Sequence, residues 1–595
     1  MDEAARRRGY WKWTKKDFLP GDSFGSWASY GSSLLKTPLR FADRLLGRSA
    51  DAAELGHVRA ESAHPMSRCL SRWDLTWLGL GSVVGAGVFV LTGQEAHDHA
   101  GPSIVLAYAT AGASATLSAL CLAEFAVEIP VAGGAFAYLR VELGDFVAFL
   151  AAANLLLKSV VGSAAVARSW TSYLATLLDR SPNSLRIPTR LAEGFNLLDP
   201  IAVSVLIATS AVAVTSTRRA SLLNWIASAV HLSIMAFVIV AGLAHADARN
   251  LSPFLPHGPQ GLFRATAVVY FAYGGFDVMV TMAEETRDPS RDIPAGLLAS
   301  MGIITLLYCL MALSLVLMER YTAIDPNAAF PAAFRNAGMG WAQRVVAMGA
   351  LVGMAKVLLV GGIGKARYAT HIARAHVVPP LFALVHPTTG TPVYATLLIT
   401  IAGAALAFFS SLSVLASQVS LSTLFIFTLI PAALLVRRYH ATGASTRASR
   451  VKLITCLSII AFSSIGTSVY WGLNPDGWIG YAITIPMWAA GTLGIQLFVP
   501  QLRPPRVWGA PLVPWLPSLS IAINVFLMGS LGSEAFVRFG FCMGVMLVYY
   551  VFYGVHATFD MAHGLCDNKN VMVEGEGNEE ARRKGPEKIE NDQIH

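Results

Sequence analysis

Charged side chains are scarce in this sequence. Asp, Glu, Lys and Arg together make up 14% of the 595 residues, whereas hydrophobic residues make up 54%. So much apolar surface exceeds what one soluble core buries, which excludes an ordinary soluble domain. The net charge is +8, but the basic residues lie mainly in the tails and between apolar stretches, a pattern typical of membrane orientation signals. We therefore expect a lipid bilayer as the surroundings and no nucleic acid partner.

Cysteine and the common enzyme motifs are also scarce. The six cysteines form no close pair and four lie in apolar stretches, so the sequence predicts neither a disulfide framework nor a zinc site. His97 and His99 lie at the outer end of a span, where two histidines are more typical of a wet edge than of a metal site. HExxH is missing, and GGIGK at residues 361–365 lacks two defining residues of a phosphate loop. We expect no enzyme activity, no cofactor and no metal.

The amino-terminal region lacks the apolar core of a signal peptide, because nothing before Leu75 resembles one. Basic and aromatic residues are interspersed there. This fits either a cytosolic tail that touches anionic lipid headgroups or a solvated tail that only sets orientation, and both interpretations place the amino terminus in the cytosol. The basic residues are Arg6, Arg7, Arg8, Lys15, Lys16, Arg40, Arg44 and Arg48.

Long apolar stretches dominate the rest of the chain. A bilayer span needs about 20 apolar residues, and this criterion predicts about 14 spans. Their approximate limits are residues 75–96, 103–127, 144–175, 199–216, 222–244, 262–283, 295–318, 342–370, 392–409, 414–436, 452–472, 478–499, 515–532 and 535–555. Most basic loops then become cytosolic, but the loop with Arg180, Arg186 and Arg190 faces outward against the positive-inside rule, partly offset by Asp179 and Glu193.

The first span is interrupted by glycines. Residues 77–94 read WLGLGSVVGAGVFVLTGQ and contain Gly79, Gly81, Gly85 and Gly87. Glycines weaken a helix, so this run indicates either close helix packing or an unwinding where backbone groups face a ligand. The spacing of Gly81 and Gly85 would suit a packing face, and both roles can coexist. We interpret the run as an unwound binding segment.

A second interruption lies five spans later, where residues 269–277 read VYFAYGGFD with adjacent Gly274 and Gly275. Corresponding breaks in two halves of a transporter point to an inverted repeat with its binding site between them. An unwound first span offers N–H groups to a carboxylate, and an unwound sixth span offers carbonyls to an ammonium group, so the expected ligand is an amino acid. The N–H groups are those near Gly85, Ala86 and Gly87, and the carbonyls are those near Phe271, Ala272 and Gly274.

Four segments in order carry a family resemblance. They are GSVVGAGVFVLTG, AEFAVEIPVAGGAFAYLRVELG, FAYGGFDVMVTMAEETRDPSRDIP, and GKARYATHIARAHVVPP with the following HPTTGTP. Over about residues 66–560 the chain resembles the plant branch of the cationic amino acid transporters, within the amino acid–polyamine–organocation superfamily. The resemblance implies a five-plus-five inverted repeat with broken first and sixth helices, about four further spans, and transport of amino acids such as arginine and lysine. It also implies that the Val83 carbonyl and the amides of residues 85–87 hold the substrate backbone.

The expected fold class is therefore an all-α integral membrane protein with four regions. Residues 1–72 form a basic cytosolic tail, and residues 73–438 form a transporter core of ten spans in two inverted repeats. Residues 439–560 add four carboxy-terminal spans. Residues 561–595 are polar and low in aromatic residues, so we expect a disordered cytosolic tail there.

Four further positions are candidates for substrate binding or selectivity. Glu124 and Asp277 are carboxylates within or beside spans, and each either pairs with a cationic substrate or forms an ion pair with a neighbouring helix. Gly361 either gives room to a long substrate side chain or packs against a helix. Lys158 occupies a position where the resembled family usually carries Glu. A cation there would invert the local field and weaken the preference for cationic substrates.

Two basic residues deep within spans are candidates for coupling. Relatives of this fold hold a sodium ion between the first and eighth spans, or place a lysine from the fifth span in that spot. The matching fifth-span residue is His231, and the eighth span carries Lys356. We hypothesise that Lys356 replaces the sodium ion as a tethered cation and that His231 carries a proton, because its unperturbed pKa lies near 6.5. The alternatives are a histidine bonded to a neighbouring helix and a lysine that reaches toward an aqueous vestibule.

The sequence thus predicts secondary active transport of amino acids, foremost cationic ones such as arginine and lysine, with proton coupling as a hypothesis. One alternative is a carrier of neutral amino acids such as glutamine. The other is a receptor that binds amino acids without transporting them. The resemblance favours the plasma membrane over the vacuolar membrane, with both termini in the cytosol.

Overall fold

The computed structural model describes residues 10–46, 70–130, 134–190, 192, 194–215, 217–387, 389–441, 443–474 and 477–563. Helices dominate these residues, and the strands among them form one antiparallel hairpin, β1 (Ile187–Pro188) with β2 (Leu197–Leu198). Within the described residues, nine helical stretches are long and apolar enough to cross a membrane, and three shorter apolar helices accompany them. The expected all-α membrane fold is confirmed.

The first half of the membrane region contains the broken first span and four further apolar helical stretches. Its elements are α6 (Arg72–Val83), α7 (Gly87–Glu95), η2 (Ala96–Ala100), η3 (Gly101–Ser103), α8 (Ile104–Glu128), α9 (Gly134–Leu143), α10 (Asp145–Leu177), α11 (Pro200–Thr215) and α12 (Thr217–Ala244). The pair α6 and α7 forms the first span, and α9 connects the second span to the third. Ser71 and Asp74 form a capping box that starts α6.

The second half begins with another broken span and continues into the carboxy-terminal helices. Its elements are η4 (Ala248–Leu251), α13 (Gly258–Val269), η5 (Tyr270–Tyr273), α14 (Asp277–Val280), η6 (Ala283–Glu285), α15 (Pro289–Met318), α16 (Ala329–Asn336), α17 (Gly340–Arg374), η7 (Pro380–Ala383), α18 (Val393–Phe409) and α19 (Leu412–Tyr439). Four helical spans follow: α20 (Arg447–Leu473), α21 (Ile479–Phe498), α22 (Trp515–Gly529), and α23 (Ser533–Tyr549) with η8 (Tyr550–Gly554).

Each expected span coincides with one helix, except the first and sixth, which are each split at their glycines. The observed helix ends differ from the expected span limits where a polar turn is also helical. α15, for example, begins at Pro289, six residues before the expected limit, because the turn PSRDIP is helical although it is not apolar. Proline suits the first turn of a helix, since the N–H that it lacks would have no intrahelical partner there.

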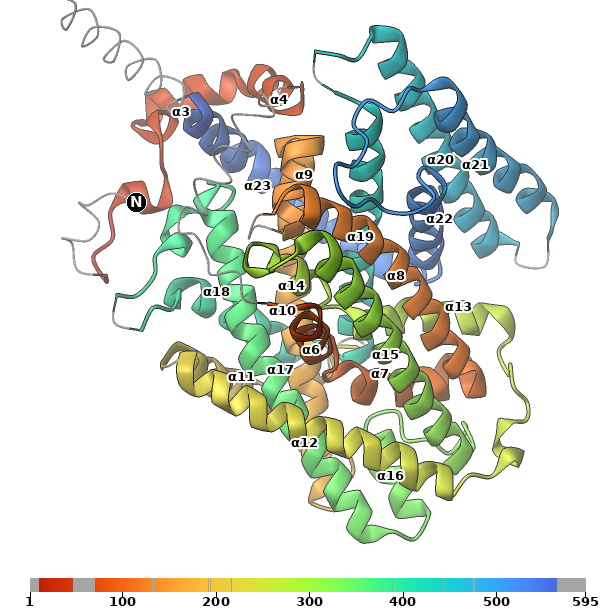
Figure 1. Ribbon diagram of the computed structural model, residues 1–595. Coiled ribbons are helices and arrows are strands. Elements are labelled where there is room, and N and C mark those ends of the chain that lie inside the picture. Colours follow the sequence, from red (N-terminus) through yellow and green to blue (C-terminus); the bar gives the residue numbers. More distant parts are fainter. Residues whose placement is uncertain are drawn as a thin grey trace, which may run out of the picture.

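The broken helices lie in the middle of the molecule. α6 packs against α14 and α15, and α10 packs against α17 and α19. Figure 1 shows α6, α7 and α14 among these longer helices, with α20, α21 and α22 to one side. The apolar window of α19 is 72% buried, whereas that of α21 is 22% buried, so α19 lies inside the bundle and α21 lies at its border.

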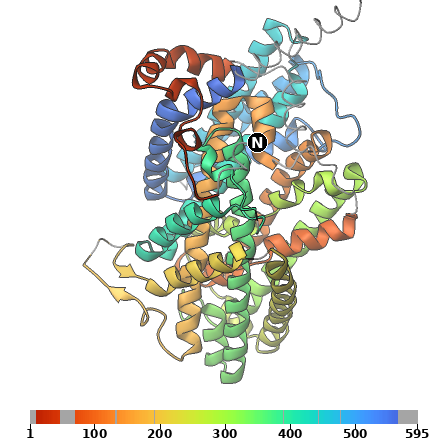
Figure 2. The same cartoon turned by 90° about the vertical axis from the view of Figure 1, so that its left-hand side faces the viewer.

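The amino-terminal residues 10–46 dock on the protein instead of forming a free tail. They contain α2 (Lys15–Phe18), η1 (Asp22–Phe24), α3 (Trp27–Leu35) and α4 (Thr37–Leu46), and Figure 2 shows α3 and α4 beside α23 at one end of the bundle. Arg40 lies 3.7 Å from Asp560, and Arg44 lies 3.0 Å from Asp145. These two arginines therefore pair with carboxylates of the protein. Residues 1–9, 47–69 and 564–595 lie outside the described residues, including Arg6, Arg7, Arg8 and Arg48.

The loop that departs from the positive-inside rule contains a buried ion pair. Nε of Arg186 lies 3.1 Å from Oδ2 of Asp199, and both side chains are buried. Asp179 lies 3.8 Å from Arg344 at the start of α17. The charge of Arg186 is thus neutralised within the protein, which leaves Arg180 and Arg190 as exposed cations of this loop.

Candidate functional site

The first break presents backbone N–H groups that have no backbone acceptor. α6 ends at Val83, Val84 adopts an extended conformation (φ −66°, ψ 99°), and α7 begins at Gly87. The N–H groups of Gly85, Ala86 and Gly87 donate no hydrogen bond to another described backbone group. The first N–H groups of a helix have no intrahelical acceptor and carry the positive end of its dipole. This geometry can receive a carboxylate, as expected from the sequence.

The two breaks are in direct backbone contact. A Cβ atom on Gly87 would lie 2.6 Å from the Cα of Ala272, and one on Gly275 would lie 2.6 Å from the carbonyl oxygen of Ser82. Gly275 also has a backbone φ of +125°, which residues other than glycine rarely adopt. Gly274 is extended, and a Cβ there would contact only its own helix at the Phe271 carbonyl, 3.2 Å away. The close approach therefore depends on Gly275, which sequence reasoning did not include among the site residues.

The carbonyls expected to face a substrate ammonium group already have protein donors. The hydroxyl of Tyr308 on α15 lies 3.0 Å from the Val83 carbonyl and 3.2 Å from the Ala272 carbonyl. The Phe271 carbonyl accepts a bond from the Gly274 amide at 3.0 Å. A carbonyl oxygen has two lone pairs, so each can accept a second donor. Tyr308 thus joins the two breaks, and sequence reasoning did not include it among the site residues.

Two basic side chains reach the carbonyls of the first break from other helices. Nζ of Lys356 on α17 lies 3.5 Å from the Val84 carbonyl, and Nε2 of His231 on α12 lies 3.3 Å from the Gly85 carbonyl. Both side chains are buried. A Cβ on Gly353 would overlap the His231 ring, so this glycine makes room for it. The structure thus brings His231 and Lys356 together at the break, where the coupling hypothesis needs them.

The second break is followed by an acid paired with a lysine. Asp277 is the first residue of α14, and its Oδ2 lies 3.5 Å from Nζ of Lys158 on α10. The same Nζ lies 5.5 Å from the centre of the Phe427 ring on α19. The field at Lys158 is therefore that of an ion pair beside an aromatic face.

A second lysine and open space lie near this pair. Lys365 on α17 donates a hydrogen bond to the hydroxyl of Ser163 at 2.8 Å and is close enough to repel Lys158 electrostatically. A Cβ on Gly361 would meet only the end of the Lys365 side chain, 3.6 Å away, and one on Gly362 would meet nothing within 4 Å. Gly361 and Gly362 therefore face room for a side chain, and no close helix packing occupies that room.

Glu124 belongs to a different part of the protein. Its carboxylate pairs with both guanidinium nitrogens Nε and Nη2 of Arg438, at 2.7 and 2.6 Å, and accepts a bond from the Ala510 amide at 2.7 Å. All three partners are buried. None of these contacts involves a broken helix. Of the two interpretations given by the sequence, the structural ion pair accounts for these contacts.

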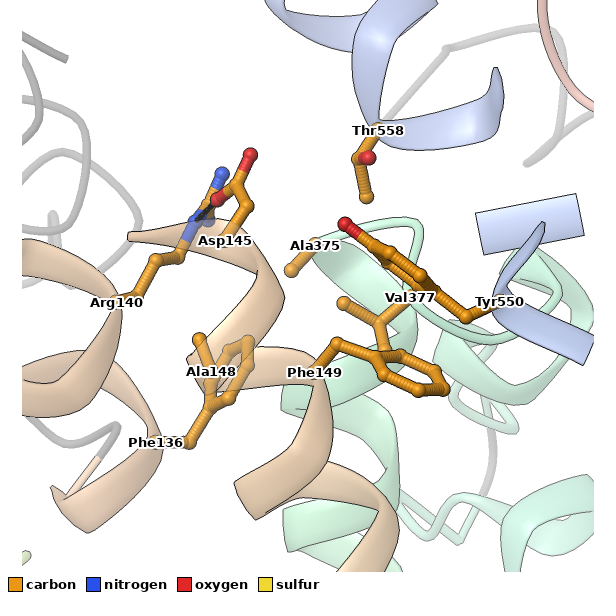
Figure 3. A pocket seen from close by; sticks show the side chains of 9 residues that line it. All are labelled: Phe136, Arg140, Asp145, Ala148, Phe149, Ala375, Val377, Tyr550 and Thr558. Carbon is orange, nitrogen blue, oxygen red and sulfur yellow. Dashed lines mark hydrogen bonds and ion pairs between the residues drawn. The ribbon is translucent and has the colours of Figure 1, made fainter. Parts of the chain in front are cut away.

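A small pocket lies apart from both breaks (Figure 3). Its walls come from α9, the start of α10, the segment after α17, and the final helix. Arg140 and Asp145 pair at 3.0 Å on one side, and the rings of Phe149 and Tyr550 close the other. None of the expected site residues lines it: the lining residues are Phe136, Arg140, Asp145, Ala148, Phe149, Ala375, Val377, Tyr550 and Thr558.

The two histidines after the first span pair with carboxylates. His97 lies 2.7 Å from Asp98, and His99 lies 3.0 Å from Glu95. Among the described residues, no group of three or more His, Cys, Asp or Glu side chains could hold a metal ion. These pairs give the histidines local partners at the end of α7.

Comparisons with known proteins agree with this geometry. The family model described as amino acid permease matches residues 70–498, and a model described as the C-terminus of that permease family matches residues 508–558. Cationic amino acid transporter 5 of Arabidopsis thaliana is 63% identical over 557 residues, which cover 93% of this chain and 98% of that protein.

Two other relatives are named for a different location or a different substrate. Cationic amino acid transporter 8, vacuolar, of Arabidopsis thaliana is 55% identical over 563 residues, covering 94% of this chain and 95% of that protein. The methylthioribose transporter of Bacillus subtilis is 34% identical over 443 residues, covering 73% of this chain and 94% of that protein. The similarity thus extends over both halves and the added spans for the plant relatives, and over a shorter part for the bacterial one.

Proposed function

The chain belongs to the amino acid permease family, in its branch of plant cationic amino acid transporters, and we propose that it carries arginine and lysine across a membrane by alternating access. One observation carries this proposal: the two broken helices touch at Gly87 and at Gly275, beside N–H groups that have no backbone acceptor. A substrate held at such a junction can be released to either side when the two helices move. The high identity to named cationic amino acid transporters supports the substrate class.

In this proposal the substrate backbone binds across the breaks. Its carboxylate accepts hydrogen bonds from the N–H groups of Gly85, Ala86 and Gly87, because these groups lie at the positive end of α7. Its ammonium group donates to the carbonyls of Val83, Phe271, Ala272 and Gly274, sharing two of them with Tyr308. Its side chain extends past Asp277 toward Gly361, where a Cβ meets only Lys365.

We further propose proton coupling through the first break. Lys356 supplies a fixed cation to the Val84 carbonyl, in place of a metal ion. His231 accepts and releases the proton beside the Gly85 carbonyl, because histidine changes charge closest to neutral pH. Protonation of His231 would place two cations at one break, which their mutual repulsion disfavours. Proton release is thereby coupled to any movement that separates α12 or α17 from the break.

Uptake into proteoliposomes tests the function. We expect the purified protein to accumulate labelled arginine and lysine in sealed vesicles, and more strongly with an inward proton gradient. Binding of arginine without flux would identify the receptor alternative. Flux that is independent of the gradient would remove the proton-coupling step and leave the carrier function intact.

A carrier of neutral amino acids remains the second candidate, because two lysines and one acid surround the expected side-chain position. Lys158, Lys365 and Asp277 give this region an excess of positive charge when all are ionised. A cationic side chain would add to it. Competition of unlabelled glutamine against labelled arginine separates the two: stronger competition by glutamine than by lysine would favour the neutral substrate.

The protein is a multi-pass membrane protein, and we propose the plasma membrane as its location with both termini in the cytosol. We also propose residues 73–438 as the ten-span core and residues 439–560 as four added spans. The docking of residues 10–46 beside Asp560 supports placing the two ends on the same side. A fluorescent fusion imaged against plasma-membrane and vacuolar markers, with protease protection of tags at each end, tests both statements.

A further inference from the structure

The pairing of Lys158 with Asp277 bears on how this acid stays neutralised when no substrate is bound, that is, in the empty carrier. Asp277 is 5% exposed and lies at the second break, within the spans. A carboxylate in such a place is costly without a cationic partner. If a substrate cation were its partner, the acid would be left unpaired each time the substrate departs. Lys158, held on a different helix, supplies a partner that stays with the protein.

The contact between these two residues has the form of an exchangeable pair. Nζ of Lys158 approaches only one carboxylate oxygen, Oδ2, at 3.5 Å. Charge-assisted hydrogen bonds are usually about 2.7–2.9 Å long. Among the described residues, no hydrogen bond is made to Oδ1 of Asp277. The Glu124–Arg438 pair differs, because it is bidentate at 2.6–2.7 Å and capped by a backbone amide. The acid at the break is therefore the less firmly held of the two.

Lys158 also has a second position available for its charge. Its Nζ lies 5.5 Å from the centre of the Phe427 ring. That ring stacks on the ring of Phe276, the residue before Asp277, with 4.6 Å between the ring centres. A cation over an aromatic face remains stabilised when it leaves an acid. The ammonium group can thus move between the carboxylate and the ring without entering a purely apolar environment.

The surrounding charges favour displacement when another cation arrives. Lys365 on α17 repels Lys158, and Tyr368 lies on the same helix. Four helices supply these side chains: Lys158 lies on α10, Asp277 on α14, Lys365 and Tyr368 on α17, and Phe427 on α19. One acid cannot neutralise two lysines and a substrate cation together, so the substrate has to compete with Lys158 for Asp277.

We propose that Lys158 is a tethered counter-ion that holds Asp277 in the empty carrier and is displaced toward Phe427 by the cationic side chain of the substrate. This inference rests on the proposed transport of cationic amino acids. It has two consequences. Lys158 weakens substrate binding by competition, and it allows the carrier to return empty, because Asp277 remains paired during the return.

The test compares net uptake with exchange in proteoliposomes that contain the full chain. Labelled arginine enters empty vesicles only if the carrier returns empty, but enters arginine-loaded vesicles by exchange. In Lys158→Met we expect the KM for arginine to fall about threefold to tenfold. We expect net uptake to fall at least tenfold, with exchange within twofold of wild type. Lys158→Arg should restore net uptake, since it returns a tethered cation.

Lys365→Met is the matched control. This lysine lies in the same region but hydrogen-bonds Ser163 and not Asp277, so its loss should leave the ratio of exchange to net uptake unchanged. An unchanged ratio in Lys158→Met, or an equal loss of exchange and net uptake in folded protein, would overturn the counter-ion role. If Lys158→Met fails to elute as a folded protein, Lys158→Met with Asp277→Asn removes both charges. That double variant should fold and exchange glutamine while losing arginine, and retained arginine exchange would contradict the proposal.

The controls separate this inference from the proposed function. If wild type carries glutamine and no arginine in either assay, the cationic substrate class is wrong. If wild type carries arginine and the Lys158→Met ratio equals that of wild type, the substrate class stands and only the counter-ion role fails.

Discussion

The two breaks differ in the charges that reach them. At the first, the basic side chains of Lys356 and His231 contact the carbonyls of Val84 and Gly85, and no described carboxylate contacts those carbonyls. At the second, the acid Asp277 follows the glycines directly and is itself paired with a lysine. The first break thus exposes backbone dipoles to cations of the protein, and the second exposes an anion.

This difference separates two tasks within one site. In the proposed function, the N–H groups and carbonyls of the first break bind what every amino acid shares, and its basic partners exchange a proton. The acid of the second break lies where amino acids differ, along the side chain. Changes at the first break should therefore alter coupling for all substrates, whereas changes at the second should alter the choice among them.

The largest effect is expected where the two breaks touch. Gly87→Leu should abolish uptake of every amino acid, because a Cβ there would lie 2.6 Å from the Cα of Ala272 and the backbone cannot yield. The control is Gly81→Leu on the same span, where a Cβ meets nothing within 4 Å. Arginine uptake per folded molecule measures both. Wild-type uptake in Gly87→Leu would show that the breaks do not meet around the substrate.

Apolar patterning predicted most of the fold because it depends on short stretches of sequence. Span positions followed from runs of about 20 apolar residues, and both breaks followed from glycines within such runs. Helix ends were less accurate, since polar turns such as residues 289–294 extend beyond the apolar window. That Gly275 makes the close approach could not be predicted, because adjacency does not tell which of two glycines takes the left-handed conformation.

The partners of the site residues could not be predicted, because they are far apart in the chain. Lys158 and Asp277 are separated by 119 positions, and Glu124 and Arg438 by 314. Sequence reasoning found each of the carboxylates and left its partner open, as pattern alone must. Tyr308 was missed because a single tyrosine in an apolar span has no pattern, and its role appears only when two breaks are placed on either side of it.

A large effect of a different kind is expected at Glu124, which contacts neither break. Glu124→Gln leaves Arg438 buried without its partner, and we expect a loss of about 3–5 kcal/mol in folding free energy. Glu128→Gln is the control. Its partner Arg437 keeps a second acid, Glu142, so the loss should be about 1 kcal/mol or less. Thermal unfolding in detergent measures the difference, and arginine uptake per folded molecule should be unchanged in both. A selective loss of arginine over glutamine uptake in Glu124→Gln would instead assign this acid to the substrate.

An intermediate effect is expected at the residue that joins the breaks. Tyr308→Phe removes the hydroxyl shared by the Val83 and Ala272 carbonyls, and a hydrogen bond contributes about 0.5–1.5 kcal/mol. The KM should rise by up to about tenfold, equally for arginine and glutamine, since the bond touches only the common part of the site. Tyr108→Phe is the control, because its hydroxyl bonds Thr92 and neither break. Unequal changes for the two substrates would mean that the breaks do not divide the tasks as described.

The smallest effect on rate, and the sharpest on pH response, is expected at the first break. His231→Asn should reduce uptake at neutral pH only a few-fold, because Asn can still bond the Gly85 carbonyl. Uptake by wild type should rise as the external pH falls, because imidazole takes up a proton, and this rise should be lost in His231→Asn. His245→Asn, just beyond the end of the same helix and exposed, is the control that should keep it. Lys356→Thr should shift the pH response to higher pH, because the fixed cation that opposes a second charge at the break is gone. Uptake of arginine and of glutamine against external pH from about 5 to 8 measures all four proteins, and both substrates should respond alike. If His231→Asn and Lys356→Thr keep the wild-type pH response and still accumulate substrate against its gradient, the first break does not carry the proton.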